Sequence, residues 1–449
     1  MAFPLEAPSH DEDAWHTLVH VCQRWRRVAF DSPRRLNLTL LCKNKRLLNT
    51  LDIWPELPIV ICVDDWECHQ PPPSVTDVVS VLKRHDRVFK ILIDDVPNSL
   101  LEELAMGNEL FPALIELDLV SFKGDPPILS DSFLGGSAPR LQSFSLWGIP
   151  FPAIGKLILS ARDLVTISLG LVPPSGLMLP EAMVDILSTL TKLKTLRLNF
   201  LCFEPPEVWT HATRQCPPTP TRVVLPALTD FYFYGNSKYL EGIVSRIDAP
   251  LDCIVVIFTN QLIVSDIPSF RDFIHRTKIR NGSHRADTFF SNVNVEISLF
   301  QRKGDIDSKA LTLRIPCSWY EEDSQLSSLA QACSTLLPPL PSLEQLGLYN
   351  SKFPPSQWQD EDNTRWMELL LFFTTVKDLV LDEPIVLSVA SSLQELVGER
   401  VAKISPALQN IYLEGFQSLG PVPEAIAKFI AARELSGHPV FVHRRELKQ

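Results

Sequence analysis

One apolar pattern returns along most of the chain, and it constrains the fold more than any other feature of the sequence. Each copy places large apolar residues at positions i, i+3 and i+5, and the first five copies begin about 23 to 29 residues apart. Because positions i+3 and i+5 point to the same side of an extended strand, each copy predicts a short strand with one buried face. The ten copies are Val88-Ile91-Ile93, Leu114-Leu117-Leu119, Leu141-Phe144-Leu146, Leu164-Ile167-Leu169, Leu193-Leu196-Leu198, Leu228-Phe231-Phe233, Leu251-Ile254-Val256, Leu343-Leu346-Leu348, Val376-Leu379-Leu381 and Leu408-Ile411-Leu413.

Proline, followed by a small or basic residue, introduces several of these strands. Proline suits this position because the turn before a strand needs no amide donor, whereas inside a parallel ladder it would remove a hydrogen bond. Between strands, apolar residues at helical spacing predict helices, for example at 180–190 and 366–373. The five proline entries are Phe111-Pro112-Ala113-Leu114, Ala138-Pro139-Arg140-Leu141, Leu225-Pro226-Ala227-Leu228, Leu340-Pro341-Ser342-Leu343 and Ser405-Pro406-Ala407-Leu408.

These features are typical of leucine-rich repeats, in which stacked strands bury a continuous apolar column that no single repeat could form. We expect an α/β fold, namely a curved leucine-rich-repeat-like solenoid with parallel strands on its concave side and helices on its convex side. A parallel β-helix enzyme, such as a polysaccharide lyase, is the alternative for stacked strands. It is disfavoured because a secreted enzyme of that kind would need an export signal and is usually rich in glycine and turn asparagine, whereas this chain of 449 residues has 17 glycines. The match to leucine-rich repeats is itself irregular, since their turn asparagine aligns only at Asn236.

The residues before the repeats predict an amphipathic helix. Apolar residues recur at spacings of three and four from Trp15 to Val28, acidic residues precede them, and Ser32-Pro33 ends the pattern. On this pattern alone, the segment could simply be a first helix that covers one end of the core.

The same segment resembles a known motif. Val21-Cys22-Gln23-Arg24-Trp25-Arg26, followed by Ser32-Pro33 and Leu36, is similar to the second half of an F-box, and the continuation to Ile61 resembles the F-box protein families of mushroom-forming fungi. The resemblance implies a helical F-box remnant that docks on the adaptor subunit of a cullin-RING ubiquitin ligase, while the rest of the chain captures a substrate protein. The adaptor-binding residues that it implies are Trp15, Leu18, Val21, Cys22, Trp25, Ser32, Pro33 and Leu36.

The first half of an F-box begins with L-P-x-E and would lie before Trp15, where only residues 1–14 stand. We expect either that such a segment is encoded upstream of Met1 or that tight adaptor binding has been lost. In the second case the protein is a leucine-rich-repeat interaction scaffold without a ubiquitin-ligase role, and its helix caps the solenoid.

Charge and composition disfavour several classes of function. The chain has 42 lysines and arginines against 53 aspartates and glutamates, a formal net charge of −11, so we expect no nucleic-acid partner. The start of the chain is acidic, and no stretch approaches the roughly 18 uninterrupted apolar residues of a membrane span. We therefore expect no signal peptide, no membrane partner and a cytoplasmic or nuclear location. The nine cysteines form no C-x-x-C pair, which indicates reduced thiols rather than a metal site.

The sequence predicts five regions. They are an acidic tail at 1–14, a partial F-box helix and first strand at 15–50, a connecting segment at 51–85, an irregular leucine-rich-repeat solenoid at 86–420 and a helical capping tail at 421–449. Within the solenoid, the prolines of residues 203–224 predict a projecting loop. The register of residues 266–339 does not follow from the pattern.

We expect partner contacts on the concave sheet face, where the side chains beside the buried positions point. Aromatic and arginine side chains dominate binding hot spots, although aromatic packing along the sheet is the alternative for any one residue. The candidates are Trp147, Arg197, Asn199, Tyr232, Tyr234, Tyr349, Tyr412 and Glu414. No nucleophile, acid–base pair or glycine-rich loop has the spacing that catalysis requires, so we expect no enzymatic activity, no catalytic residue, no metal and no cofactor.

Overall fold

The fold is α/β, with a large and mostly parallel sheet. In the computed structural model, sixteen of the described strands belong to this sheet, and two short strands form a separate parallel pair. The chain divides into two compact units, Met1–Arg197 and Leu198–Gln449. The structure describes residues 22–31, 39–42, 56–63, 73–122, 125–151, 155–173, 176, 178–200, 222–259, 267–277, 279–291, 293–304, 306–317, 323–350, 362–394, 406–415 and 424–445.

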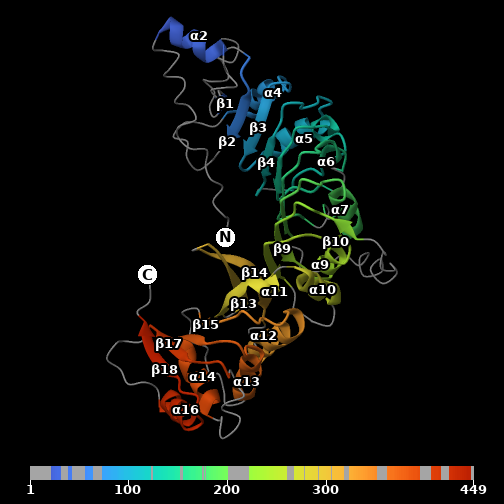
Figure 1. The fold of residues 1–449 in the computed structure, drawn as a ribbon. Coiled ribbons are helices and arrows are strands. Elements are labelled where there is room, and N and C mark those ends of the chain that lie inside the picture. Colours follow the sequence, from blue (N-terminus) through green and yellow to red (C-terminus); the bar gives the residue numbers. More distant parts are fainter. Residues whose placement is uncertain are drawn as a thin grey trace. The chain divides into compact units, whose positions relative to one another are not determined.

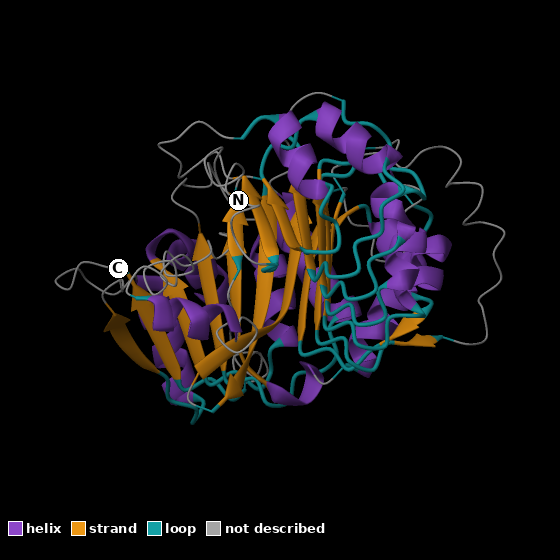
Figure 2. Cartoon of the chain, turned by 90° about the horizontal axis from the view of Figure 1, so that it is seen from above, coloured by secondary structure: helices purple, strands orange, loops and turns teal. Residues whose placement is uncertain are grey.

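The first unit alternates strands and helices. Its strands are β1 (Leu40–Cys42), β2 (Ile59–Val63), β3 (Val88–Ile93), β4 (Glu116–Val120), β5 (Ser143–Trp147), β6 (Thr166–Gly170) and β7 (Thr195–Asn199), which ends just past the division between the units. Its helices are α2 (Gln23–Asp31), α4 (Val75–Leu82), α5 (Asn98–Met106), the 3-10 helix η2 (Phe133–Gly136), α6 (Gly155–Ser160) and α7 (Pro180–Leu187). The strands follow one another in chain order, and helices α4 to α7 run along one side of them (Figures 1 and 2).

Apolar columns run through this unit from strand to strand. The register pairs Ile91 with Leu117, Leu117 with Phe144 and Phe144 with Ile167, and each of these side chains is at most 1% exposed. Burying one such side chain contributes about 1.5–3 kcal/mol. The second column, made by the residues two positions further along each strand, is buried in the same way.

The proline entries form a repeated turn. In each of the four entries that the structure describes in full, the leucine that follows donates its amide to the carbonyl three residues earlier, as Leu114 does to Phe111 at 3.3 Å and Leu141 does to Ala138 at 3.0 Å. Proline then stands at the second position of the turn, where its fixed φ is favoured. The turn thereby places a buried leucine just before each of these strands.

The second unit contains more kinds of element. Its strands are β8 (Val223–Val224), β9 (Asp230–Gly235), β10 (Ile247–Asp248), β11 (Cys253–Phe258), β12 (Ser283–Phe290), β13 (Asn294–Lys303), β14 (Ile306–Pro316), β15 (Gln345–Asn350), β16 (Asp378–Asp382), β17 (Asn410–Glu414) and β18 (Phe441–Arg445). Its helices are α9 (Ser237–Val244), α10 (Pro268–Arg276), α11 (Ile279–Gly282), α12 (Asp323–Leu336), α13 (Asp362–Phe372), α14 (Glu383–Gln394) and α16 (Glu424–Leu435).

The second unit departs from the parallel arrangement expected throughout the repeats. Strands β12, β13 and β14 form an antiparallel meander, inserted so that β14 pairs with β11 and β12 pairs with β15, both in parallel. The register still continues the apolar columns, because Ile254 pairs with Leu311, Leu311 with Leu299, Leu299 with Ala286 and Ala286 with Leu346. The meander is therefore part of the same core.

Other boundaries also differ from the expected ones. Residues 51–85, expected to be a connecting segment, contribute β2 and α4, so sheet structure begins before residue 86. The expected loop 203–224 lies outside the described residues except at its end, where Val223–Val224 pairs with β10. The expected helical tail at 421–449 contains the helix α16 and the strand β18. The expected solenoid 86–420 is divided between the two units.

Candidate functional site

The two faces of the sheet have different surroundings. In β9, Phe231 and Phe233 are buried, and their rings lie 6.3 Å from those of Phe273 in α10 and Tyr239 in α9. The helices therefore lie on that side. Tyr232 and Tyr234 alternate with these phenylalanines, so they lie on the opposite side of the strand, where both are half-buried. We call that side the polar face and define it by the strand residues that alternate with the buried columns.

The candidates on β5 and β7 lie on the polar face. Trp147 is half-buried, and its indole lies across Gly170 of the next strand, where a Cβ would stand only 2.3 Å from a ring atom. Arg197 is exposed, while the side-chain oxygen of Asn199 is buried and has no hydrogen-bond partner among the described residues. Trp147 thus combines packing on the sheet with a partly accessible ring.

A buried carboxylate lies on the same face and was not singled out by the sequence. Asp118 is 9% exposed, and its Oδ1 has no hydrogen-bond partner in the described structure. Burial raises the pKa of this carboxyl to about 6, with Glu116 and Asp94 adding to the rise and a hydrogen bond with Ser145 opposing it. Folding therefore makes ionisation of this carboxyl less favourable than it is in the unfolded chain.

Replacing Asp118 by asparagine is expected to stabilise the first unit at neutral pH. A carboxyl whose pKa is raised in the folded state favours the fold below its unfolded pKa of 3.8, and this contribution is lost as the pH rises through about 6. At pH 7.5, Asp118→Asn should therefore gain about 1–3 kcal/mol, with little change below pH 4. Urea denaturation across this pH range measures the effect. A destabilisation at pH 7.5 would contradict it.

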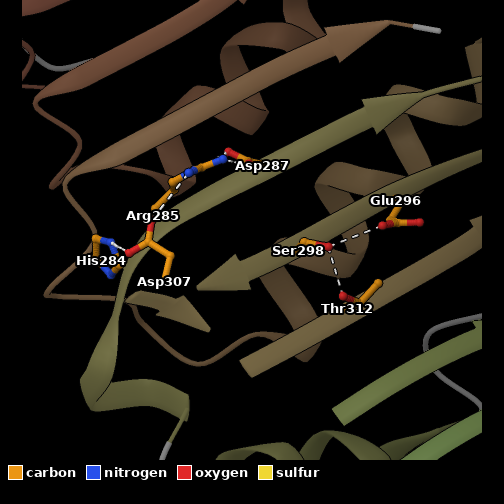
Figure 3. Close-up of polar contacts among 7 residues, drawn as sticks. All are labelled: His284, Arg285, Asp287, Glu296, Ser298, Asp307 and Thr312. Carbon is orange, nitrogen blue, oxygen red and sulfur yellow. Dashed lines mark hydrogen bonds and ion pairs between the residues drawn. The ribbon is translucent and has the colours of Figure 1, made fainter. Parts of the chain in front are cut away.

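The meander of the second unit carries a network of ion pairs on the polar face (Figure 3). Arg285 donates to both carboxylate oxygens of Asp287, with Nε 2.9 Å from Oδ1, and Asp287 is only 2% exposed. Asp307 of β14 lies 3.5 Å from Nη1 of Arg285 and 3.0 Å from Nε2 of His284. The Arg285 guanidinium also lies over the Phe300 ring, 4.9 Å from its centroid.

A second polar group crosses β13 and β14. Ser298 and Thr312 share a hydrogen bond of 2.9 Å between their hydroxyls, and both residues are buried. Ser298 also donates to Glu296 at 3.3 Å (Figure 3). Glu296 accepts from Nε and Nη2 of Arg314 at 2.8 and 2.6 Å. These groups bond to one another, so they link β13 to β14.

Aromatic side chains continue the polar face beyond the meander. The rings of Phe289 and Tyr349 stack 5.0 Å apart, and Tyr349 lies over Gly347, where a Cβ would be 2.5 Å from its ring. Burial, with a further contribution from Asp287, raises the pKa of the Tyr349 phenol. Tyr349 therefore stays protonated and able to donate a hydrogen bond at neutral pH.

Tyr412 lies at the centre of the last cluster. Its ring stacks on that of His443 at 4.9 Å, and the Arg445 guanidinium lies 3.6 Å from its centroid. Asn410 donates to Asp378 at 2.8 Å, so its Oδ1 is the acceptor towards Nε2 of His443 at 3.1 Å. Nε2 therefore carries a proton. Glu414, half-buried, is the register partner of Arg445.

The structure thus brings together three of the expected residues, Tyr349, Tyr412 and Glu414, in one region of β15 to β18. Tyr232 and Tyr234 lie on the same face of β9. The sequence patterns did not identify the residues of the meander and of β18 that surround them. Neither segment carries the repeated apolar pattern, so its pairing with other strands could not be predicted. The only available signal was the alternation in residues 292–299, which gives a strand but not its partners.

The amino-terminal helix is described only in part. Cys22 and Trp25 are exposed, with Trp25 at 52% and its neighbour Val28 at 56%. The helix ends at Asp31, just before the expected stop at Ser32-Pro33. The remaining residues implied by the resemblance, namely Trp15, Leu18, Val21, Ser32, Pro33 and Leu36, lie outside the described residues.

Comparison with known proteins adds no relative. No known protein family matches the sequence, and no curated protein matches it. Within the described ranges, no helix is both long and apolar enough to cross a membrane. The same residues contain no group of three histidine, cysteine, aspartate or glutamate side chains arranged to hold a metal ion.

Proposed function

We propose that the chain is the substrate-recognition subunit of a cullin-RING ubiquitin ligase, similar to fungal F-box proteins. The amino-terminal helix docks on the adaptor subunit, and the polar face of the sheet holds a target protein. The strand ladder is leucine-rich-repeat-like, and its role is to present that face. Ubiquitin transfer follows from proximity, so no residue of this chain acts as a catalytic residue.

The observation that carries the proposal is the exposure of Trp25 and Val28 on α2. Large apolar side chains that remain exposed on a short amphipathic helix mark a docking surface. They stand three residues apart, so they share one side of the helix. Trp25 also belongs to the run that resembles an F-box.

The polar face supports the target-binding half of the proposal. It offers Tyr232, Tyr234, Tyr349, Tyr412 and the Arg445 guanidinium, which are the side-chain types enriched in binding hot spots. Arg285 and Arg314 form ion pairs with carboxylates of the meander itself, and these pairs help to order its strands. A face that is already ordered loses less entropy when a partner binds.

Trp25→Ala is expected to weaken adaptor binding by about thirtyfold, because tryptophan anchors are worth about 2 kcal/mol or more at interfaces. Calorimetry with the purified chain and the purified adaptor subunit measures this loss. Leu435→Ala is the matched control, since Leu435 is 90% exposed on α16 and should leave binding unchanged. Absence of binding by the unmodified chain would instead favour the interaction scaffold without a ligase role.

A further inference from the structure

The last strand of the described sheet has an open side. Strand β18 pairs in parallel with β17 over five residues, and it stands at the end of the strand order. Its first residue, Phe441, is 62% exposed, and His443 and Arg445 are exposed as well. By contrast, the side chains of β1, at the other end of the order, are at most 4% exposed.

The backbone direction of β18 determines which groups face outward. The amide of Phe441 donates to the carbonyl of Gln409 at 2.8 Å, which points the backbone groups of Phe441, His443 and Arg445 towards β17. The amide and carbonyl of the intervening Val442 therefore point away from β17. Such an edge is a template for another strand.

The side chains of β18 indicate the charge of the strand that would fit. His443 and Arg445 lie on the polar face, and the guanidinium carbon of Arg445 lies 3.6 Å from the centroid of the Tyr412 ring. A guanidinium over an aromatic face uses that face for a cation–π contact, and its N–H donors lie in its own plane, where they can bind a carboxylate through two hydrogen bonds. Arg445 has an acidic register partner, Glu414, on β17. An acidic residue on a strand added to the open edge of β18 would give Arg445 an opposite charge on that side as well.

A second copy of this chain fits poorly. Pairing β18 with another β18 would bring the basic side chains of both strands along one seam, and like charges directly opposite one another are destabilising. We propose that β18 accepts an extended acidic segment of the target protein as an additional strand, with carboxylates opposite His443 and Arg445 and an apolar residue opposite Phe441. This inference rests on the proposed function, because it names the chemistry of the target.

The test uses the full chain and a fluorescein-labelled peptide in which every second residue is threonine and the others are glutamate, except for one valine that matches Phe441. Binding is measured by fluorescence anisotropy. Two matched peptides accompany it, one with lysine in place of glutamate and one N-methylated at alternate backbone nitrogens. Strand addition through acidic residues predicts at least about tenfold weaker binding for each matched peptide. Equal binding of the lysine peptide, or of the N-methylated peptide, would overturn the inference.

Two variants test the same contacts from the protein side. Val442→Pro removes an amide that points away from β17 and leaves the hydrogen bonds to β17 in place. It should lower the affinity for the glutamate peptide by about tenfold. Arg445→Glu should do the same, whereas Arg271→Glu on α10 gives an equal charge change away from the edge and should have no effect. If Val442→Pro does not fold, the N-methylated peptide still tests the backbone contact.

Adaptor binding separates this inference from the proposed function. Arg445→Glu should bind the adaptor as tightly as the unmodified chain does. Adaptor binding without peptide binding would overturn only the strand addition. Peptide binding without adaptor binding would support strand addition and contradict the ligase role.

Discussion

Phe144→Ala is expected to lower the free energy of unfolding by about 3–5 kcal/mol. Phe144 is completely buried, and its register partners Leu117 and Ile167 lie on the strands to either side. Truncation removes the apolar transfer free energy of a phenyl ring and leaves a cavity that stacked strands cannot easily close, since their spacing is fixed by backbone hydrogen bonds.

The matched control is Ser143→Ala, one residue earlier in the same strand and on the polar face. Its effect should stay within about 0.5 kcal/mol. Urea denaturation followed by circular dichroism measures both variants. If Phe144→Ala and Ser143→Ala lowered the free energy of unfolding by similar amounts, the assignment of these neighbouring residues to opposite faces of the sheet would be contradicted.

Asp287→Ala is expected to lower the free energy of unfolding by about 2–3 kcal/mol. The carboxylate of Asp287 is buried and accepts two hydrogen bonds from Arg285, so its removal leaves a guanidinium without its main partner. Arg285 is about 31% exposed and keeps a 3.5 Å contact with Asp307. Water and Asp307 therefore offset part of the loss, which places the effect below that of a fully buried broken pair.

An exposed ion pair supplies the comparison for this effect. Arg271 and Asp272 are about half exposed on α10, and Asp272→Ala should change stability by less than about 1 kcal/mol. The difference between the two variants in urea denaturation measures what burial adds. Equal effects would show that Asp287 has no structural role in the meander.

The sequence predicts the parallel rungs well, because each carries its own local signal. All ten copies of the apolar pattern coincide with strands. Each copy spans six residues, and these six residues alone show which side of the strand is apolar and which is polar. The meander could not be placed in this way. Its core side includes Thr288, which breaks the apolar pattern, and antiparallel pairing depends on residues far apart in the chain.

The candidate site was likewise predictable only where its residues lie on strands with the repeated apolar pattern. Tyr349 and Tyr412 follow directly from alternation around the leucines. Arg285 and Asp287 lie on a strand that has no leucine pattern, and His443 lies on β18, where the sequence gives five residues with three basic side chains. Their contacts with the predicted tyrosines depend on the order of the strands in the sheet, and a local sequence pattern does not predict that order.

The most direct test of the central claim is photocrosslinking in living cells, with a photoreactive phenylalanine analogue placed at single positions of the full chain. Tyr412 and Tyr234 report on the polar face, and Leu371, exposed on α13, reports on the helix side. Partner binding on the polar face predicts discrete partner adducts from the two tyrosine positions and none from Leu371. Adducts from Leu371 alone would contradict it, since the partner would then lie against the helices and not on the sheet.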